Sequence, residues 1–287
     1  MKRKLGLVLG SGSARGWAHI GVIRELADAG YAPDIVCGCS IGAFVGAGYA
    51  NGDLDKMEQW TRSLTSQEVL KLLDVSLSGG LIKGDKLLSF FERHFVDRSF
   101  SELPMPFACV ATDLASGKEV LLREGSVAMA LRASIALPGL FRPVPRDGQL
   151  LVDGGLVNPV PVAIARTLGA DVVIAVDLGS DIVGRALRKA APGESTWVGL
   201  KQNLAERFGI GDRGELPSMA SVLVTSIHIM QTHIAQNRRA TEPADVLLLP
   251  RLANLALMDY HRADEAISEG REAVKRMLPE IRAVLSR

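Results

Sequence analysis

The pentapeptide G-C-S-I-G at residues 38–42 contains a serine in a setting that could make it a nucleophile. It lies between an apolar run, 35–37, and a run of small residues, 41–50, which predict a buried strand and a helix. G-x-S-x-G between a strand and a helix is typical of a nucleophile elbow. The Ser40 hydroxyl would then lie at a helix N-terminus, where free N–H groups favour developing negative charge. The same residues also fit a glycine-rich turn with a capping serine.

A carboxylate that could serve as the base follows much later, in the tripeptide D-G-G at residues 153–155. A serine hydroxyl is a weak nucleophile and needs a base within hydrogen-bond reach. Asp153 follows a short apolar stretch, 149–152, that predicts a buried strand. Burying a carboxylate there requires hydrogen bonds or a functional partner. The alternative is a turn aspartate that is bonded to its own backbone.

The glycine-rich loop G-S-G-S-A-R-G at residues 10–16 follows an apolar run, 5–9, that is typical of a strand covered on both faces. A dinucleotide fingerprint, G-x-G-x-x-G, would need its third glycine where Arg15 stands, and no acidic residue ends the following strand. The loop is better suited to bind an anion through its N–H groups, opposite whatever Ser40 attacks. A plain strand-to-helix turn remains the structural alternative.

Composition excludes several classes of protein. The 287 residues are 47% hydrophobic, with 33 basic and 32 acidic side chains, so nothing indicates a nucleic-acid partner. No stretch approaches the ~20 apolar residues of a membrane span. Three cysteines make neither a disulfide framework nor a zinc site. We therefore expect a reduced, cytoplasmic protein.

Strand-like and helix-like segments alternate along the chain, which predicts an α/β fold with a largely parallel sheet. We expect one domain over residues 1–287. The expected strands are 5–9, 35–37, 107–112, 120–122, 149–152, 172–176 and 246–249. The expected helices are 17–29, 41–50, 53–64, 67–73, 85–95, 126–135, a helix ending at 168, 219–238 and 260–285, the last interrupted at Pro279, with a loop at 78–80.

The order and spacing of the glycine-rich loop, the elbow and D-G-G resemble the patatin-like phospholipase family. Ala133-Ser134 with Pro138 and Phe141 also looks like a stretch of that family. The resemblance covers roughly residues 5–180, and the amino-acid sequence around the elbow is most similar to that of small bacterial members. It implies a three-layer α/β/α fold and a Ser–Asp dyad that works without histidine.

The resemblance also implies a role for each motif. Ser40 would attack an acyl-ester lipid, with Asp153 as the base, through an acyl-enzyme. The remaining site residues divide into oxyanion-hole donors (Gly10, Ser11, Gly12 and Ser13) and supporting positions (Arg15, Gly16, Gly38, Gly42, Gly154 and Gly155). Arg15 would hold the shape of the loop. This chemistry requires no metal and no cofactor.

Two other functions remain open from the sequence. An α/β-hydrolase triad could use His228, His233 or His261 in the required chain order, although only about two strands precede Ser40. A non-catalytic regulatory or scaffold protein could keep the same site. His19, on the helix after the glycine-rich loop, is expected to be a packed or surface residue.

Residues 178–217 are rich in Gly, Arg and Glu and predict a mobile insertion or lid. Within this stretch, Ser195 is a candidate N-cap, and four apolar residues at helical spacing would form one face: Trp197, Leu200, Leu204 and Phe208. That face would contact a membrane surface as a peripheral site, or it would pack on the core or on a second subunit of a homo-oligomer.

Overall fold

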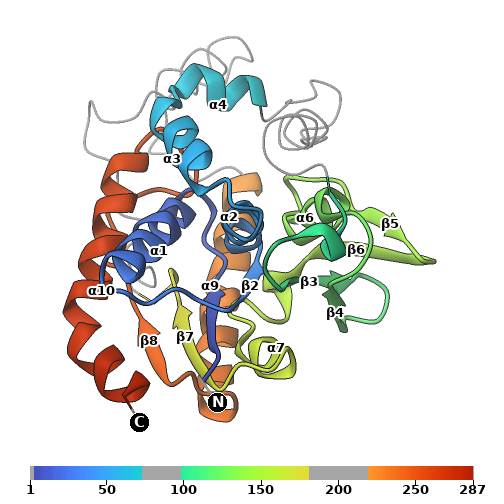
Figure 1. Ribbon diagram of the computed structural model, residues 1–287. Coiled ribbons are helices and arrows are strands. Elements are labelled where there is room, and N and C mark those ends of the chain that lie inside the picture. The colour runs from blue at the N-terminus through green and yellow to red at the C-terminus, as the bar shows by residue number, and fades with distance from the viewer. Residues whose placement is uncertain (1–2, 73–97, 181–218, 287) are drawn as a thin grey trace.

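A central sheet with helices on both faces forms the protein (Figure 1). The computed structural model describes residues 3–72, 98–180 and 219–286. The expected loop at 78–80, the expected helix at 85–95 and the apolar stripe between 195 and 208 lie outside these residues. The strands are β1 (Leu5–Leu9), β2 (Ile35–Cys39), β3 (Phe107–Asp113), β4 (Glu119–Leu122), β5 (Val144–Arg146), β6 (Gln149–Asp153), β7 (Val172–Val176) and β8 (Val246–Leu248).

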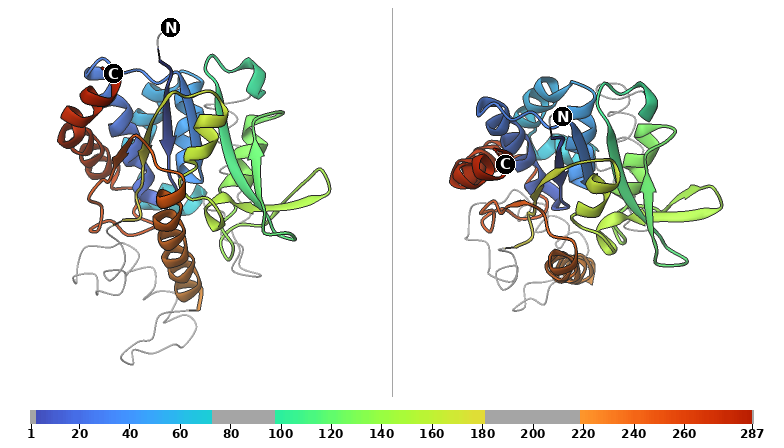
Figure 2. Two further views of the ribbon diagram at one scale, coloured as in Figure 1. Left: turned by 90° about the horizontal axis from the view of Figure 1, so that it is seen from below. Right: turned by 60° about the horizontal axis from the view of Figure 1, so that its bottom comes forward.

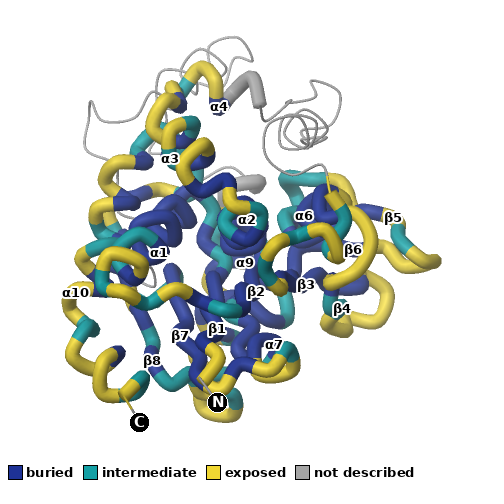
Figure 3. Tube along the Cα trace, viewed as in Figure 1, coloured by how far each residue is buried: buried dark blue, intermediate teal, exposed yellow. Residues whose placement is uncertain are grey.

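Within the described residues the sheet has eight strands, in the order β5-β6-β3-β2-β1-β7-β8, with β4 paired to β3. The pairs among β3, β2, β1, β7 and β8 are parallel, whereas β4, β5 and β6 pair antiparallel. Every residue of β1, β2, β3 and β7 is buried, as Figure 3 shows, because helices cover both faces. The predicted three-layer α/β/α arrangement is confirmed.

Two apolar cores lie on the two faces of the sheet. The described helices are α1 (Ala18–Asp28), α2 (Ile41–Ala50), α3 (Leu54–Ser63), α4 (Ser66–Leu72), α6 (Val127–Ser134), α7 (Val162–Thr167), α9 (Met219–Thr241) and α10 (Ala263–Leu285). Helices α1, α2, α6 and α10 pack on one face and α7 on the other, and both views of Figure 2 show α9 on the opposite side of β1 from α2. Short 3₁₀ helices are η1 (Ser13–Trp17), η2 (Phe100–Glu102) and η3 (Gly154–Leu156).

Strand β3 brings the ends of two other strands together. Ala111 pairs with β4 on one edge of β3 and with Asp153 of β6 on the other edge. Cys109 pairs with β4 on the first edge and with β2 on the second. Strands β2 and β6 therefore share one edge of β3, and they run in opposite directions. Cys39 faces Val110 and Asp153 faces Ala111, so the two carboxyl ends meet at adjacent positions of β3.

Helix α10 crosses α1 at two glycines. A Cβ at Gly21 would overlap the carbonyl of Ile267, and a Cβ at Gly270 would overlap that of Ala18. The expected break at Pro279 is wrong, because α10 runs on to Leu285. Pro279 is exposed, so the carbonyl it leaves unpaired can face water while the buried face keeps its packing.

One hairpin was not predicted from the sequence. Strand β5 pairs with β6 across a turn in which Asp147 and Gly148 have φ of 49° and 77°. The D-G dipeptide is a hairpin signal, but Pro145 in the preceding strand obscures it.

No helix among the described residues is long and apolar enough to cross a membrane.

Candidate active site

Ser40 lies between β2 and α2 in a strained turn, with φ of 54° and ψ of −122°. Non-glycine residues rarely adopt positive φ, and such strain is typical of functional sites. The flanking glycines leave no room for side chains. A Cβ at Gly38 would lie 2.5 Å from the Ala43 backbone, and one at Gly42 would overlap the carbonyl oxygen of Leu9. The turn therefore has the geometry expected of a nucleophile elbow.

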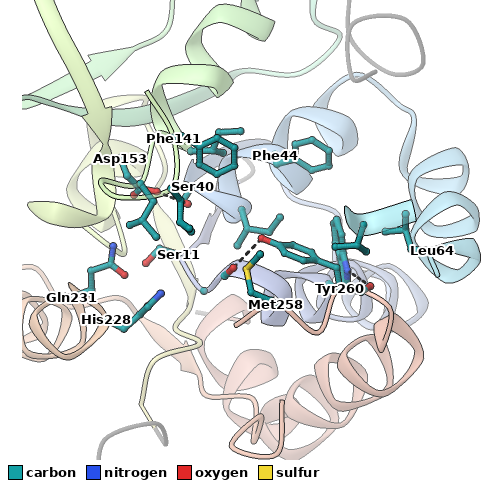
Figure 4. Close-up of a pocket in the computed structure, with 18 of the residues that line it drawn as sticks. Ser11, Ser40, Phe44, Leu64, Phe141, Asp153, His228, Gln231, Met258 and Tyr260 are labelled. Carbon is teal, nitrogen blue, oxygen red and sulfur yellow. Dashed lines mark hydrogen bonds between the residues drawn. The ribbon is translucent and has the colours of Figure 1, made fainter. Parts of the chain in front are cut away.

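The Ser40 hydroxyl donates a hydrogen bond to Asp153, with 2.7 Å between Oγ and Oδ2 (Figure 4). The other carboxylate oxygen, Oδ1, accepts the N–H of Gly155 at 2.7 Å. Asp153 thus bonds both its own turn and the serine. A Cβ at Gly154 would overlap the carbonyl of Val110, which explains the first glycine of the motif.

Burial raises the pKa of Asp153 from 3.8 to about 6, while the hydrogen bonds from Ser40 and Gly155 act in the opposite direction. The side chain is only 1% exposed, so desolvation of the carboxylate outweighs the two bonds. At neutral pH the carboxylate is still mostly ionised, and it is a stronger base than an aspartate in water. A pKa near the working pH suits a general base.

The end of α6 holds the backbone of both residues. Ser134 Oγ accepts the N–H of Ser40 at 3.0 Å, and the carbonyl oxygen of Ala136 accepts the N–H of Asp153 at 3.0 Å. Ser134 is fully buried. Two positions in one short segment therefore fix the spacing of the dyad. Sequence reasoning noted Ser134 only as part of a family stretch and assigned it no role.

The glycine-rich loop supplies fewer N–H groups than expected. The N–H of Gly10 donates to Val176 at 3.0 Å, and the N–H of Ser11 donates to Pro159 at 2.9 Å, both to carbonyl oxygens. These two N–H groups hold the loop to its neighbours, so their predicted role as oxyanion donors does not fit this structure. The N–H groups of Gly12 and Ser13 donate to no other described residue. Gly12 and Ser13 also line the cavity beside Ser40.

Side chains behind the loop hold its shape. His19 is fully buried and its Nε2 donates to the carbonyl oxygen of Gly10 at 2.8 Å. Burial lowers the pKa of His19 to about 4, so the ring is neutral. Arg15 Nε donates to the carbonyl oxygen of Leu255 at 3.0 Å, and a Cβ at Gly16 would overlap the side chain of Ile41. The expected packing of His19 is confirmed.

A largely apolar cavity opens onto the dyad, with an empty volume of about 870 Å³ that is partly open to solvent. One apolar wall comes from η1, α2, α3, α4 and the segment before α10 (Trp17, Ile41, Phe44, Trp60, Leu64, Val69, Met258 and Tyr260). A second comes from the segment after α6 (Ile135, Leu137, Leu140 and Phe141). The polar lining consists of the dyad, the glycine-rich loop and two side chains of α9, His228 and Gln231.

The three histidines of the triad hypothesis lie in different environments. His228 lines the cavity, His233 is exposed on α9, and His261 is half-buried before α10. Burial, with a smaller effect of the Arg15 charge, lowers the pKa of His228 to about 4. No hydrogen bond within the described residues joins Ser40 to a histidine, whereas one joins it to Asp153. Gln231 was not recognised from the sequence, since an amide on a long helix carries no signal.

The protein has an α/β fold with a serine–carboxylate pair at the wall of an apolar cavity. Residues 7–166 match the family model described as patatin-like phospholipase. This chain belongs to that family, and membership supports a lipid hydrolase in general.

Individual relatives support the same family assignment. An uncharacterized NTE family protein of Mycobacterium tuberculosis is 34% identical, over 93% of this chain and 89% of the relative. Human patatin-like phospholipase domain-containing protein 6 is 39% identical, over 61% of this chain and 13% of the relative. The crystal structure of VipD from Legionella pneumophila matches with a TM-score of 0.50 and 14% identity, over 97% of this chain and 67% of VipD. At that identity the match to VipD shows the fold alone.

Proposed function

We propose that this protein is a serine acyl hydrolase that cleaves lipid esters through an acyl-enzyme, with Ser40 as nucleophile and Asp153 as base. The observation that carries the proposal is the 2.7 Å hydrogen bond from Ser40 Oγ to Asp153 Oδ2. It joins a strained nucleophile elbow to a carboxylate whose pKa is raised to about 6, at the wall of an apolar cavity.

In the acylation step Asp153 Oδ2 takes the proton of the Ser40 hydroxyl while Oγ attacks the ester carbonyl carbon. The carbonyl oxygen becomes an oxyanion, and the N–H groups of Gly12 and Ser13 are the loop donors left to bind it. Each such donor is typically worth about 3 kcal/mol. When the tetrahedral intermediate collapses, the ester C–O bond breaks and Asp153 returns the proton to the leaving alcohol.

Deacylation repeats the sequence with water. Asp153 takes a proton from a water molecule, whose oxygen attacks the acyl carbon bound to Ser40. The bond from Oγ to the acyl carbon breaks, Ser40 regains its proton from Asp153, and the fatty acid leaves. One carboxylate therefore serves both steps, and no histidine is required.

The apolar walls of the cavity are suited to an acyl chain. Phe44, Trp60, Leu64 and Val69 extend this lining away from the dyad toward α3 and α4, and Figure 4 shows Leu64 far to one side of Ser40. Transfer of a chain into such a lining contributes about 0.8 kcal/mol per CH₂ group. We therefore expect esters of medium or long fatty acids to be better substrates than acetates.

Labelling with a fluorophosphonate probe tests this function, since the probe modifies only an activated serine. We expect the purified protein to be labelled and to hydrolyse a panel of acyl esters, and the Ser40→Ala protein to do neither. A folded wild-type protein that is not labelled and cleaves no ester would contradict the proposal and favour the scaffold alternative.

A further inference from the structure

Two polar side chains of α9, His228 and Gln231, form part of the cavity wall. They lie three residues apart and so share one face of the helix. His228 is 9% exposed and Gln231 is 5% exposed. Neither the imidazole nor the amide forms a hydrogen bond with another described residue, and His228 Nε2 is fully buried without a partner.

Among the described residues, His228 Nε2 is buried without a hydrogen-bond partner, and burying a polar atom in that way carries a desolvation penalty. The rest of the wall shows that apolar side chains fit this cavity, so packing alone does not require an imidazole and an amide there. The pair is therefore suited to a ligand that completes its hydrogen bonds.

As far as the described residues form it, the polar part of the cavity carries no positive charge that could bind a phosphate. Among the described residues that line the cavity, none is a lysine or an arginine, and Asp153 is the carboxylate. Burial keeps the His228 ring neutral, with its pKa lowered to about 4. Arg15, whose charge contributes to that shift, is buried behind the loop and bonded to Leu255. The ligand groups that fit are uncharged.

The pair lies on the side of the dyad where the alcohol part of an ester would leave. Figure 4 shows Gln231 and His228 on one side of Ser40 and Leu64 on the other. Gln231 contacts the D-G-G turn, because a Cβ at Gly155 would overlap its Nε2. An ester with its acyl chain toward Leu64 would therefore direct its alcohol toward α9.

We propose that His228 and Gln231 form a subsite for the free hydroxyl groups of a glycerol-type leaving group, and so select esters of an uncharged polyol. This inference rests on the proposed hydrolase function. A hydroxyl both donates and accepts, as do a neutral imidazole and an amide, so the three groups are complementary. Two sources supply such a glycerol: a monoacylglycerol, or a lysophospholipid whose phosphate lies outside the subsite.

The test compares two esters of one fatty acid, a 1-monoacylglycerol and a methyl ester. The ratio of their kcat/KM values cancels any effect on folding, on acyl binding or on the dyad. We expect this ratio to fall about 5- to 10-fold in His228→Phe and in Gln231→Leu, the effect of one lost hydrogen bond. Two matched changes on the exposed face of α9, His233→Phe and Gln236→Leu, should leave the ratio within twofold of wild type.

A ratio that stays within twofold in both His228→Phe and Gln231→Leu overturns the subsite, whatever their total activity. A lysophosphatidylcholine with the same acyl chain distinguishes the two sources of glycerol. An equal fall with this substrate shows that the shared hydroxyl is recognised, and a fall with the monoacylglycerol alone shows that the second free hydroxyl is recognised.

Failure of the hydrolase function itself gives a different result, namely a wild-type protein that cleaves neither ester. In that case, binding of a 1-O-alkylglycerol ether, which has no ester bond, is measured by calorimetry. A dissociation constant that is 5- to 10-fold weaker in both α9 variants supports the subsite, and equal constants overturn it.

Discussion

The ends of β2 and β6 meet on one edge of β3, yet they hold their functional residues differently. Ser40 follows a parallel strand and is half-buried at the start of a helix, in a turn whose strain is local. Asp153 ends an antiparallel strand, is 1% exposed and depends on pairing with Ala111. The geometry of the proposed nucleophile is therefore set by its sequence neighbours, and that of the proposed base by residues far away in the chain.

This difference separates two tasks. The turn must present a hydroxyl to the cavity, and small neighbouring residues achieve that. The proposed base must be partly shielded from water, and only the surrounding layers of the fold can do so. Substitutions at Ser40 and at Asp153 should therefore affect activity to different extents, unless the two residues act as one unit during the reaction.

The largest effect should come from removing either end of the dyad. We expect Ser40→Ala and Asp153→Ala each to lower kcat by roughly 10³-fold or more, and the double variant to be no worse than either single one. Steady-state kinetics on a soluble ester, with circular dichroism to confirm folding, measures this. Near-wild-type turnover by Asp153→Ala would show that the two ends do not act together.

Acidic pH should inactivate the enzyme by protonating Asp153, since a neutral carboxyl cannot accept the serine proton. With the pKa raised to about 6, kcat/KM should fall about tenfold per pH unit below pH 6 and so about 100-fold by pH 4. A pH–rate profile on a soluble ester checks this, with folding followed at each pH. A flat profile down to pH 5 would mean that Asp153 titrates like an exposed aspartate.

Stability should show the cost of burying the base. The Asp153 pKa is raised on folding from 3.8 to about 6, so its contribution is fully present below pH 4 and is lost as pH rises through 6. Asp153→Asn should therefore raise the free energy of unfolding at pH 7.5 by up to about 3 kcal/mol and change it little at pH 4. Urea denaturation at both values measures this. Ser40→Ala is the control, and an equal gain by both variants at pH 7.5 would contradict the account.

The smallest effect should come from Ser134, whose hydroxyl accepts a hydrogen bond from the backbone N–H of Ser40. Ser134→Ala removes the acceptor for the Ser40 N–H and should lower kcat about fivefold with little change in KM, as expected for one hydrogen bond. Ser134→Thr keeps the hydroxyl and should restore most of kcat. If the alanine variant keeps the wild-type kcat, the elbow holds its own shape and needs no support from α6.

The parts of the site that the sequence predicts are those with local causes. The pentapeptide around Ser40 predicts its turn because the required glycines are neighbours in the chain. D-G-G predicts the turn of Asp153 but not its strand direction, which depends on pairing with β3. The parallel core strands are equally predictable, since their apolar runs are continuous.

The parts that escaped prediction depend on distant partners. The N–H groups of Gly10 and Ser11 donate to carbonyls of Val176 and Pro159, 166 and 148 residues later, and no local pattern shows this. Pro279 is tolerated because its side of α10 faces water, which depends on how the helix packs. Gln231 becomes relevant only because α9 contacts the turn after β6.

The crossing of α1 and α10 at Gly21 and Gly270 has a consequence for biosynthesis. Helix α1 is made early, and the helix that covers it is made more than 230 residues later. At about 5–20 residues per second the ribosome needs at least about ten seconds to bridge that interval. During this time the face of α1 around Ala18 and Gly21 lacks its partner helix, so this crossing forms only after α10 has been synthesised.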